Sequence, residues 1–210
     1  MIKVLIADDH PVVREGLKQV ISKASDMQVA DEAVNGQEAL SKVAEQKFDV
    51  VVLDVGMPGR DGLEILKDIH KDFPKLPVLV LSMYPEDQVA IRALNAGASG
   101  YMNKETAPKE LVNAIRKIFL GGKYVSESLA EKFASGLYLR AKESPQEQLS
   151  DREFQVLRMI ASGKETSEIA DELFISVKTV RTYRDRVLEK LNLKNDVEIT
   201  HFAMKNNLLG

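Results

Sequence analysis

The 210-residue chain contains no cysteine, and it has no long apolar run. The first absence excludes disulfides and thiolate metal sites, and it fits a reducing compartment. The second argues against a transmembrane helix, which needs roughly 18 apolar residues in a row. No basic and apolar leader precedes the first strand pattern, so we expect no signal peptide. Together these features predict a soluble, cytoplasmic protein with no membrane partner.

An excess of charge of one sign is also missing, because the formal net charge is only −3. A balance this close to zero argues neither for nor against nucleic acid as a partner. Apolar residues make up 44% of the chain and charged residues 29%, so we expect a sizeable core and a well-solvated surface. The length predicts one large domain or two ordinary ones.

Short apolar runs alternate with helical patterns over residues 1–121, which we expect to form the first domain. The runs cover residues 2–7, 29–34, 50–53, 78–81 and 98–102. Near-continuous apolar strands separated by helices are typical of an α/β fold, a doubly wound five-stranded parallel sheet with both faces covered.

Residues 122–146 are expected to form a linker with a short helix, in which apolar residues stand four apart (Leu129, Phe133, Leu137). Residues 147–210 show only helical spacings and predict a small all-α domain. Its first helix is expected after Ser150, because Ser150 and Glu153 form a capping-box pattern before an apolar run.

Polar residues follow the predicted strands where each one ends. They are Asp8 and Asp9, Asp54, Ser82 and, beyond the fifth run, Lys104. Because the carboxyl ends of parallel strands meet at one edge of a sheet, we expect these side chains to gather there. Clustered carboxylates repel one another unless a cation lies among them, and their oxygens suit Mg²⁺. A carboxylate beside Mg²⁺ and a lysine also suits an aspartyl-phosphate, so the sequence predicts a phosphoacceptor site.

Four blocks of the sequence resemble the signatures of response-regulator receiver domains: ADDH, VVLDVGMPGRDG, LVLSMY and GYMNK. The segment from Leu149 to Asn192 resembles the LuxR-type helix-turn-helix. In this order they are similar to NarL/FixJ-type two-component response regulators over nearly the whole chain. The resemblance implies a flavodoxin-like receiver that a histidine kinase phosphorylates. It also implies a homodimer that binds paired half-sites in double-stranded DNA and acts on the transcription machinery.

The resemblance assigns the metal and phosphate chemistry to particular residues. Asp54 is the expected phosphoacceptor. Asp9 and Asp54 are expected to bind Mg²⁺ with the Gly56 backbone carbonyl, and Asp8 is expected to help through water. The loop after the acceptor fits the family pattern at three positions, Pro58, Gly59 and Gly62.

Two further residues, Ser82 and Lys104, are expected by resemblance to contact the phosphoryl oxygens. Tyr101 is expected to turn inward when Ser82 moves. The chain departs from many receivers in having Glu105 where a proline follows the lysine, and Met83 where a smaller residue follows the serine. Neither departure removes a required group. The surface used for dimerisation stays open between the fourth-helix/fifth-strand/fifth-helix face and the face of the first and fifth helices.

Two other functions are alternatives to phosphorylation-dependent regulation. A phosphatase with an aspartate nucleophile, similar to the haloacid-dehalogenase type, carries a second aspartate two residues after the first. Gly56 stands at that position and counts against this enzyme. The other alternative is a binding module that is never phosphorylated, against which the intact acidic and basic set argues. No Walker or G-x-G-x-x-G pattern is present, and the histidines show no metal-binding spacing, so they are expected to be ordinary surface or cap residues.

Charge in the C-terminal segment is segregated between two predicted helices. The helix from about Val177 to Leu191 is mostly basic, as a DNA-reading helix requires, whereas the preceding helix is acidic. The buried stripe of the basic helix is predicted to contain Val177, Val180, Val187, Leu188 and Leu191. The expected DNA contacts are Lys178, Thr179, Arg181, Thr182, Tyr183, Arg184, Asp185 and Arg186.

Different contacts are expected to do different work. By resemblance, Arg181 and Thr182 are the base readers, whereas Lys178 and Arg184 are expected to meet phosphates. Tyr183 stands where many family members have histidine. Asp185 is open between pairing with Arg181 and accepting a hydrogen bond from a cytosine amine.

Overall fold

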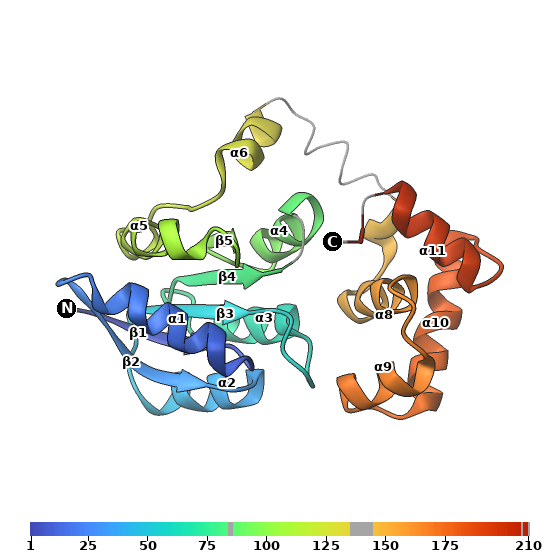
Figure 1. Cartoon of the computed structure of the whole chain (residues 1–210), viewed down its shortest axis with the longest axis horizontal. Helices are drawn as coiled ribbons and strands as arrows, with labels where there is room; N and C mark the ends of the chain where they lie inside the picture. Colours follow the sequence, from blue (N-terminus) through green and yellow to red (C-terminus); the bar gives the residue numbers. More distant parts are fainter. Residues whose placement is uncertain (84–85, 135–144, 207, 210) are drawn as a thin grey trace. The chain divides into compact units, whose positions relative to one another are not determined.

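The structure, a computed structural model, describes residues 1–83, 86–134, 145–206 and 208–209. The chain divides into two compact units, Met1–Ser126 and Glu127–Gly210, coloured along the sequence in Figure 1. The predicted domain limits, after residues 121 and 146, stay predictions. In the part of the chain that is described, no helix has the length and apolar character needed to cross a membrane.

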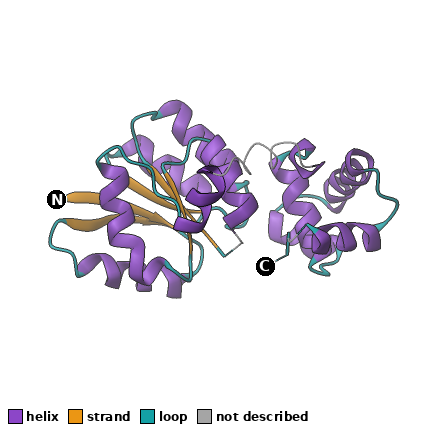
Figure 2. Ribbon diagram, turned by 90° about the horizontal axis from the view of Figure 1, so that it is seen from above, coloured by secondary structure: helices purple, strands orange, loops and turns teal. Residues whose placement is uncertain are grey.

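Strands and helices alternate along the first unit (Figure 1). They are β1 (Ile2–Ala7), α1 (Pro11–Ser22), β2 (Met27–Ala33), α2 (Gly36–Glu45), β3 (Val50–Asp54), α3 (Gly62–Asp72), β4 (Val78–Ser82), α4 (Glu86–Asn95), β5 (Gly100–Asn103) and α5 (Ala107–Phe119). All neighbouring strands pair in parallel, in the order β2-β1-β3-β4-β5. Figure 2 shows the strands enclosed between helices. The predicted doubly wound sheet is therefore confirmed.

Both faces of the central strands are buried, which explains their unbroken apolar sequences. Every residue of β3 and β4 is buried. On one face, alternate strand residues pack against α1 and α5 in a single cluster that includes Ile2, Val4, Ile6, Val50, Val52, Leu79, Leu81, Leu17, Ile21, Leu111 and Ile115. Because α1 packs on α5, and α3 on both α2 and α4, the helices form a layer on each side of the sheet.

Two observed strands begin at other residues than the predicted ones. The second begins at Met27, two residues before the predicted start, and the fifth begins at Gly100 and not at residue 98. The physical reason for the second shift is the end of α4. Gly97 adopts a positive φ of 106°, and the Ala98 N–H donates to the Ala93 carbonyl at 3.0 Å. Ala98 therefore closes a helix and does not extend the strand.

The second unit is helical throughout its described residues. It contains α6 (Glu127–Ala134), the 3₁₀ helix η1 (Pro145–Gln148), α8 (Asp151–Ala161), α9 (Thr166–Leu173), α10 (Val177–Leu191) and α11 (Asp196–Lys205). The predicted capping box at the start of α8 is confirmed in both directions. The short helix expected in the linker corresponds to α6, while Leu137 lies outside the described residues. The core of the unit packs α8, α9 and α10 through Val156, Met159, Ile169, Ala170, Leu173 and Val180.

Candidate functional site

A lysine and two carboxylates meet at the carboxyl edge of the sheet. Lys104, which follows β5, places its Nζ 2.6 Å from Asp54 Oδ2 and 2.7 Å from Asp8 Oδ2. Asp8 follows β1 and is fully buried, and Asp54 ends β3 and is 2% exposed. The Lys104 hydrogen bond is directed at Asp54, so the Asp8 contact is an ion pair without hydrogen-bond geometry. The strand-end prediction is met for these three residues.

The tight turn after β1 orients the remaining acidic residue and a histidine. Asp8 Oδ1 accepts a hydrogen bond from the His10 backbone N–H at 2.8 Å. The His10 Nδ1 atom lies 3.1 Å from Asp8 Oδ1 and 3.0 Å from Asp9 Oδ1. His10 does hold the position before α1, but its side chain makes no capping hydrogen bond. Sequence reasoning missed its place in the acidic cluster, because no motif spacing marks a contact made by a local turn.

Oxygen atoms suited to a hard cation converge at this edge. Asp8, Asp9, His10 and Asp54 each offer a ligand atom, and these atoms all lie within 4.8 Å of one another. Among the described residues, Asp8 Oδ2 and Asp9 Oδ1 are buried and accept no well-aligned hydrogen bond, although Lys104 Nζ lies 2.7 Å from the first and His10 Nδ1 lies 3.0 Å from the second. Buried carboxylate oxygens with so few donors gain from a further cation. The residues therefore fit Mg²⁺, which binds carboxylate oxygens and keeps several waters.

The environment of Asp54 opposes ionisation. Burial raises the pKa of Asp54 above its ordinary value, although the Lys104 ammonium works in the opposite direction. Burial alone would lower the pKa of Lys104, but Asp54 and Asp8 outweigh it and raise that pKa. Gly56 also supports the charged carboxylate, because its N–H donates to Asp54 Oδ1 at 2.8 Å. Two buried carboxylates thus share one ammonium, which favours a further cation.

Ser82 and Tyr101 lie on neighbouring strands. Ser82 is at the carboxyl edge of the sheet, and Tyr101 is within its strand, further from that edge. Ser82 ends β4, is 1% exposed, and accepts a hydrogen bond from the Lys104 backbone N–H through its carbonyl at 2.9 Å. Asp54 pairs in register with Leu81, so Ser82 lies one residue further toward the edge. Tyr101 is fully buried in β5. Met83, the departure noted above, is 61% exposed.

The loop between β3 and α3 is held very close to the strand. Asp61 caps α3 by accepting from the Leu63 N–H at 2.7 Å. A Cβ on Gly62 would lie 2.4 Å from Val55 Cα, so only glycine fits. Gly59 has a φ of 92°, which glycine adopts without strain. Gly59 and Gly62 therefore allow the tight path of the loop that contains Gly56.

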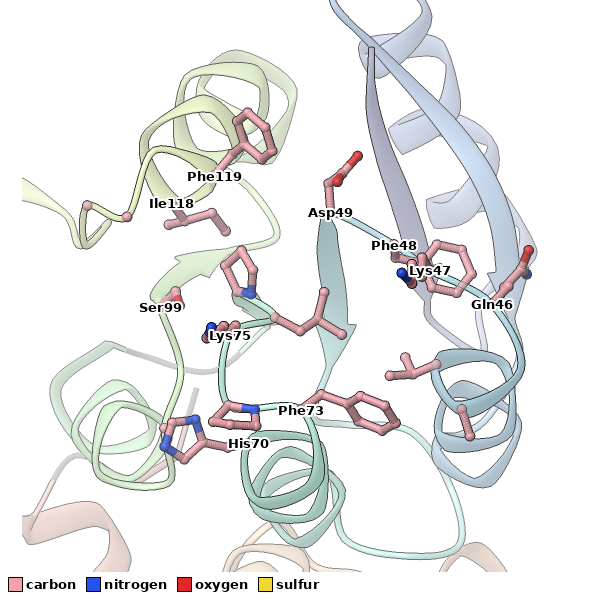
Figure 3. A pocket seen from close by; sticks show the side chains of 18 of the residues that line it. Gln46, Lys47, Phe48, Asp49, His70, Phe73, Lys75, Ser99, Ile118 and Phe119 are labelled. Atoms are coloured by element: carbon pink, nitrogen blue, oxygen red, sulfur yellow. The ribbon is translucent and has the colours of Figure 1, made fainter.

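A large cavity of about 950 Å³ lies at the opposite, amino edge of the sheet. Figure 3 shows Phe48, Phe73, Ile118 and Phe119 around it, with Lys75 near the middle of the view. Its lining comes from the segments that precede β3, β4 and β5 and from the end of α5 with the residues that follow it. It is therefore separate from the acidic cluster, which lies where these strands end.

The second candidate surface is the N-terminal part of α10. Ser176 caps this helix, because its Oγ accepts from the Thr179 N–H at 3.0 Å. Val180 and Val187 are fully buried, as predicted. The prediction that Val177 faces the core is wrong, because Val177 is 37% exposed. Its place in the first turn, ahead of the contact with α8 and α9, leaves it outside the core.

The exposed face of α10 holds cations without carboxylate partners. Among the described residues, Lys178, Arg181 and Arg186 form no ion pair, and all three are exposed. Arg184 differs, because its Nε donates to Asp196 of α11 at 2.6 Å and its Nη1 to Asp185 at 3.2 Å. Asp185 therefore pairs with its neighbour Arg184 in this structure, and its contact with a cytosine amine stays a prediction.

The remaining predicted DNA contacts have local roles. Thr179 Oγ1 lies 2.8 Å from Ser176 Oγ, within the cap. Thr182 is exposed, and its hydroxyl donates to the Lys178 carbonyl at 3.0 Å. Tyr183 is half-buried against the core of α8, α9 and α10. The predicted contacts that are exposed are Lys178, Arg181, Thr182, Asp185 and Arg186.

Comparisons with known proteins agree with this anatomy. Residues 4–116 match the family model of the response regulator receiver domain, and residues 147–203 match that of the bacterial regulatory proteins of the luxR family. The fold and the acidic edge define the first unit as a receiver domain, and the helices of the second form a LuxR-type helix-turn-helix.

The chain belongs to the NarL/FixJ family of two-component response regulators. It is 37% identical to the response regulator UvrY of Escherichia coli K12 over 99% of this chain and 96% of that protein. It is 39% identical to the response regulator GacA of Pseudomonas aeruginosa over 100% of this chain and 98% of that protein. The RcsB response regulator of Salmonella enterica serovar Typhimurium, bound to promoter rprA with the phosphomimetic BeF3-, has a TM-score of 0.69 at 28% identity, over 96% and 97% of the two chains.

Proposed function

We propose that a histidine kinase transfers a phosphoryl group to Asp54, and that this transfer promotes dimerisation and sequence-specific DNA binding. The observation that best supports the proposal is the pair of contacts on Asp54. One oxygen meets the Lys104 ammonium at 2.6 Å and the other the Gly56 N–H at 2.8 Å. In the transfer, the P–N bond of a phosphohistidine breaks and a P–O bond to Asp54 forms.

Each residue of the acidic edge has a role in this proposal. Asp9 and Asp54 would hold Mg²⁺ with the Gly56 carbonyl, and Asp8 would help through water. When bound, the ion would supply positive charge beside the transferring phosphoryl group. Lys104 keeps its proton and neutralises phosphoryl oxygens. We assign no catalysis beyond this phosphotransfer and the hydrolysis of the aspartyl phosphate.

Incubation with Mg²⁺ and acetyl phosphate, followed by intact mass measurement, tests the acceptor. The wild-type chain should gain one phosphate, and Asp54→Asn should gain none. Asp72→Asn, which changes an exposed aspartate at the end of α3, is the matched control and should behave as wild type. An undiminished gain in Asp54→Asn would move the site elsewhere. If the wild type gained nothing yet bound DNA, the chain would be the unphosphorylated binding module.

Dimerisation is proposed to follow from a rearrangement of Ser82 and Tyr101. New phosphoryl oxygens attract the Ser82 hydroxyl, and the Tyr101 ring packs into the space it leaves. Sedimentation with and without acetyl phosphate measures the result directly. Identical mass distributions over a wide concentration range would contradict it.

DNA recognition is proposed to divide between base readers and phosphate contacts. The DNA-bound RcsB relative supports DNA binding by this chain. Because the second helix of a helix-turn-helix enters the major groove, α10 is proposed to lie there, with Arg181 and Thr182 at base edges and Lys178 at a phosphate. Arg184 leaves the set of phosphate contacts, because Asp196 holds it. Arg181→Ala should cost about 1–3 kcal/mol and relax sequence preference at one position. Lys178→Ala should weaken all duplexes alike and lower the salt slope by about one. Equal weakening of cognate and scrambled duplexes by Arg181→Ala would reverse this division.

A further inference from the structure

The end of α9 has an unusual residue in a left-handed turn. Phe174 adopts φ 54° and ψ 42°. Its N–H is directed at the Asp171 carbonyl at 3.3 Å, and the Ile175 N–H donates to the Ala170 carbonyl at 3.0 Å. This pair of bonds is the Schellman motif, which favours glycine at the left-handed position. Here a bulky aromatic residue occupies it.

Other helix ends of the same chain show what this turn normally takes. The matching positions after α4, α5 and α8 are Gly97, Gly121 and Gly163, and after α10 the residue is Asn192. Glycine and asparagine tolerate a positive φ, whereas an aromatic side chain is strained there. The turn itself therefore gives no reason for Phe174.

Packing gives no reason either. The Phe174 residue is 75% exposed, so its ring buries little area in the fold. An apolar ring that is both strained and exposed contributes little to folded stability. Such strain is concentrated at functional sites, where a side chain must be presented to a partner.

The position of Phe174 indicates the partner. It stands two residues before the Ser176 cap and three before Val177, the partly exposed valine of the first turn. This end of α10 also presents Lys178 and Arg181 without carboxylate partners, which makes the surface around it attractive to an anionic polymer. In a helix-turn-helix, this end of the second helix enters the major groove.

We infer that Phe174, together with Val177, is an apolar DNA contact. Its ring packs against the apolar atoms at the margin of the major groove, either thymine 5-methyl groups or deoxyribose carbons. This inference rests on the proposed DNA-binding function and deepens it, because it adds an apolar contact to the polar base readers. It also explains why a residue unsuited to its backbone conformation stands in the turn.

The test compares DNA affinity with stability in the full-length chain. The probe is a duplex selected from a random-sequence library by the wild-type protein. Phe174→Gly removes both the ring and the strain, so its unfolding midpoint should stay equal or rise by a few degrees. Its affinity should fall about tenfold, equivalent to ~1.4 kcal/mol. Phe174→Tyr keeps the ring and should keep the affinity. Asn192→Gly, which changes the matching turn after α10, is the control and should leave affinity unchanged.

The outcomes distinguish a failure of the apolar contact from a failure of DNA binding itself. If the wild type selected no duplex, the proposed DNA binding would fail. If it did, and Phe174→Gly bound equally well, or lost affinity only together with stability, the apolar contact would be refuted. Replacing thymine by deoxyuracil in the probe then identifies the DNA atoms. If this replacement weakens binding by the wild type but not by Phe174→Gly, the ring contacts the thymine methyl group. If it leaves the wild-type affinity unchanged, the ring contacts the deoxyribose.

Discussion

Replacing Gly62 by alanine should disturb the acceptor site through the backbone alone. Gly62 opens α3 directly after its cap, and an added Cβ would lie 2.4 Å from Val55 Cα and 2.8 Å from the Val55 carbonyl oxygen. Cβ contacts below 3.0 Å are essentially never seen, so the loop must move by about 0.6 Å. Both atoms are backbone, and no side chain can rotate away to make room.

The expected loss of stability follows from two opposing effects. Overpacking of this kind costs about 1–3 kcal/mol. Alanine in place of glycine returns up to about 1 kcal/mol of helix propensity. We therefore expect a net loss of up to about 2 kcal/mol, and the unfolding midpoint should fall by roughly 3–6 °C for each kcal/mol lost in a unit of this size. Because Gly56 lies in the displaced loop and holds Asp54 through its N–H, phosphorylation by acetyl phosphate should slow about tenfold.

Gly16→Ala is the matched control. Gly16 is exposed within α1, and a Cβ there meets nothing within 4 Å. This variant should gain about 0.5–1 kcal/mol of stability and phosphorylate at the wild-type rate. Thermal unfolding and the rate of mass gain measure both variants. A Gly62→Ala chain as stable and as fast as wild type would refute the reasoning from close approach.

Three further predictions follow from individual ion pairs. Lys104→Met leaves two buried carboxylates without their cation, so urea unfolding should show a loss of about 3 kcal/mol that added Mg²⁺ partly restores. Asp196→Asn removes the closer of the two carboxylates that Arg184 contacts, so the salt slope of DNA binding should steepen by up to about one, and an unchanged slope would contradict this. Lys190→Met removes the ammonium 2.6 Å from buried Glu153 and should cost about 1–2 kcal/mol at neutral pH, discounted because Lys190 is partly exposed. Burial opposes ionisation of Glu153, but Lys190 outweighs it and lowers its pKa below 4.5. The gap to wild type should therefore close as pH falls through that lowered pKa, and a gap independent of pH would contradict the assignment.

The fold was predictable from the sequence because burial shaped the pattern of each strand. The runs at residues 50–53 and 78–81 are apolar throughout, since both faces of β3 and β4 are covered. The ends of strands were less predictable. Ala98 is apolar, but its N–H donates to a carbonyl at the end of α4 and not to a neighbouring strand. Hydrophobicity alone does not distinguish a helix end from a strand.

The acidic edge was predictable for a topological reason. In a parallel sheet the chain itself brings strand ends together, so the positions of Asp8, Asp54 and Lys104 in the sequence imply their contact. His10 and the Arg184–Asp196 pair were not predictable in this way. Their contacts depend on a local turn and on the approach of a separate helix, which leave no periodic signal. Exposure of Val177 is similar, because it depends on where the core of the second unit ends.

The two candidate sites keep their charges in opposite environments, and this difference has a functional consequence. Asp8, Asp54 and the Lys104 side chain are nearly inaccessible, so their interactions act through a low dielectric and are little screened by salt. Lys178 and Arg181 are exposed, and DNA binding through such residues weakens steeply with added salt, because releasing counterions into a more concentrated solution is less favourable. Added salt should therefore separate the two functions in one sample. DNA binding would weaken over a range in which the rate of Asp54 phosphorylation by a small donor stays nearly constant, because only the exposed site works through screened charges.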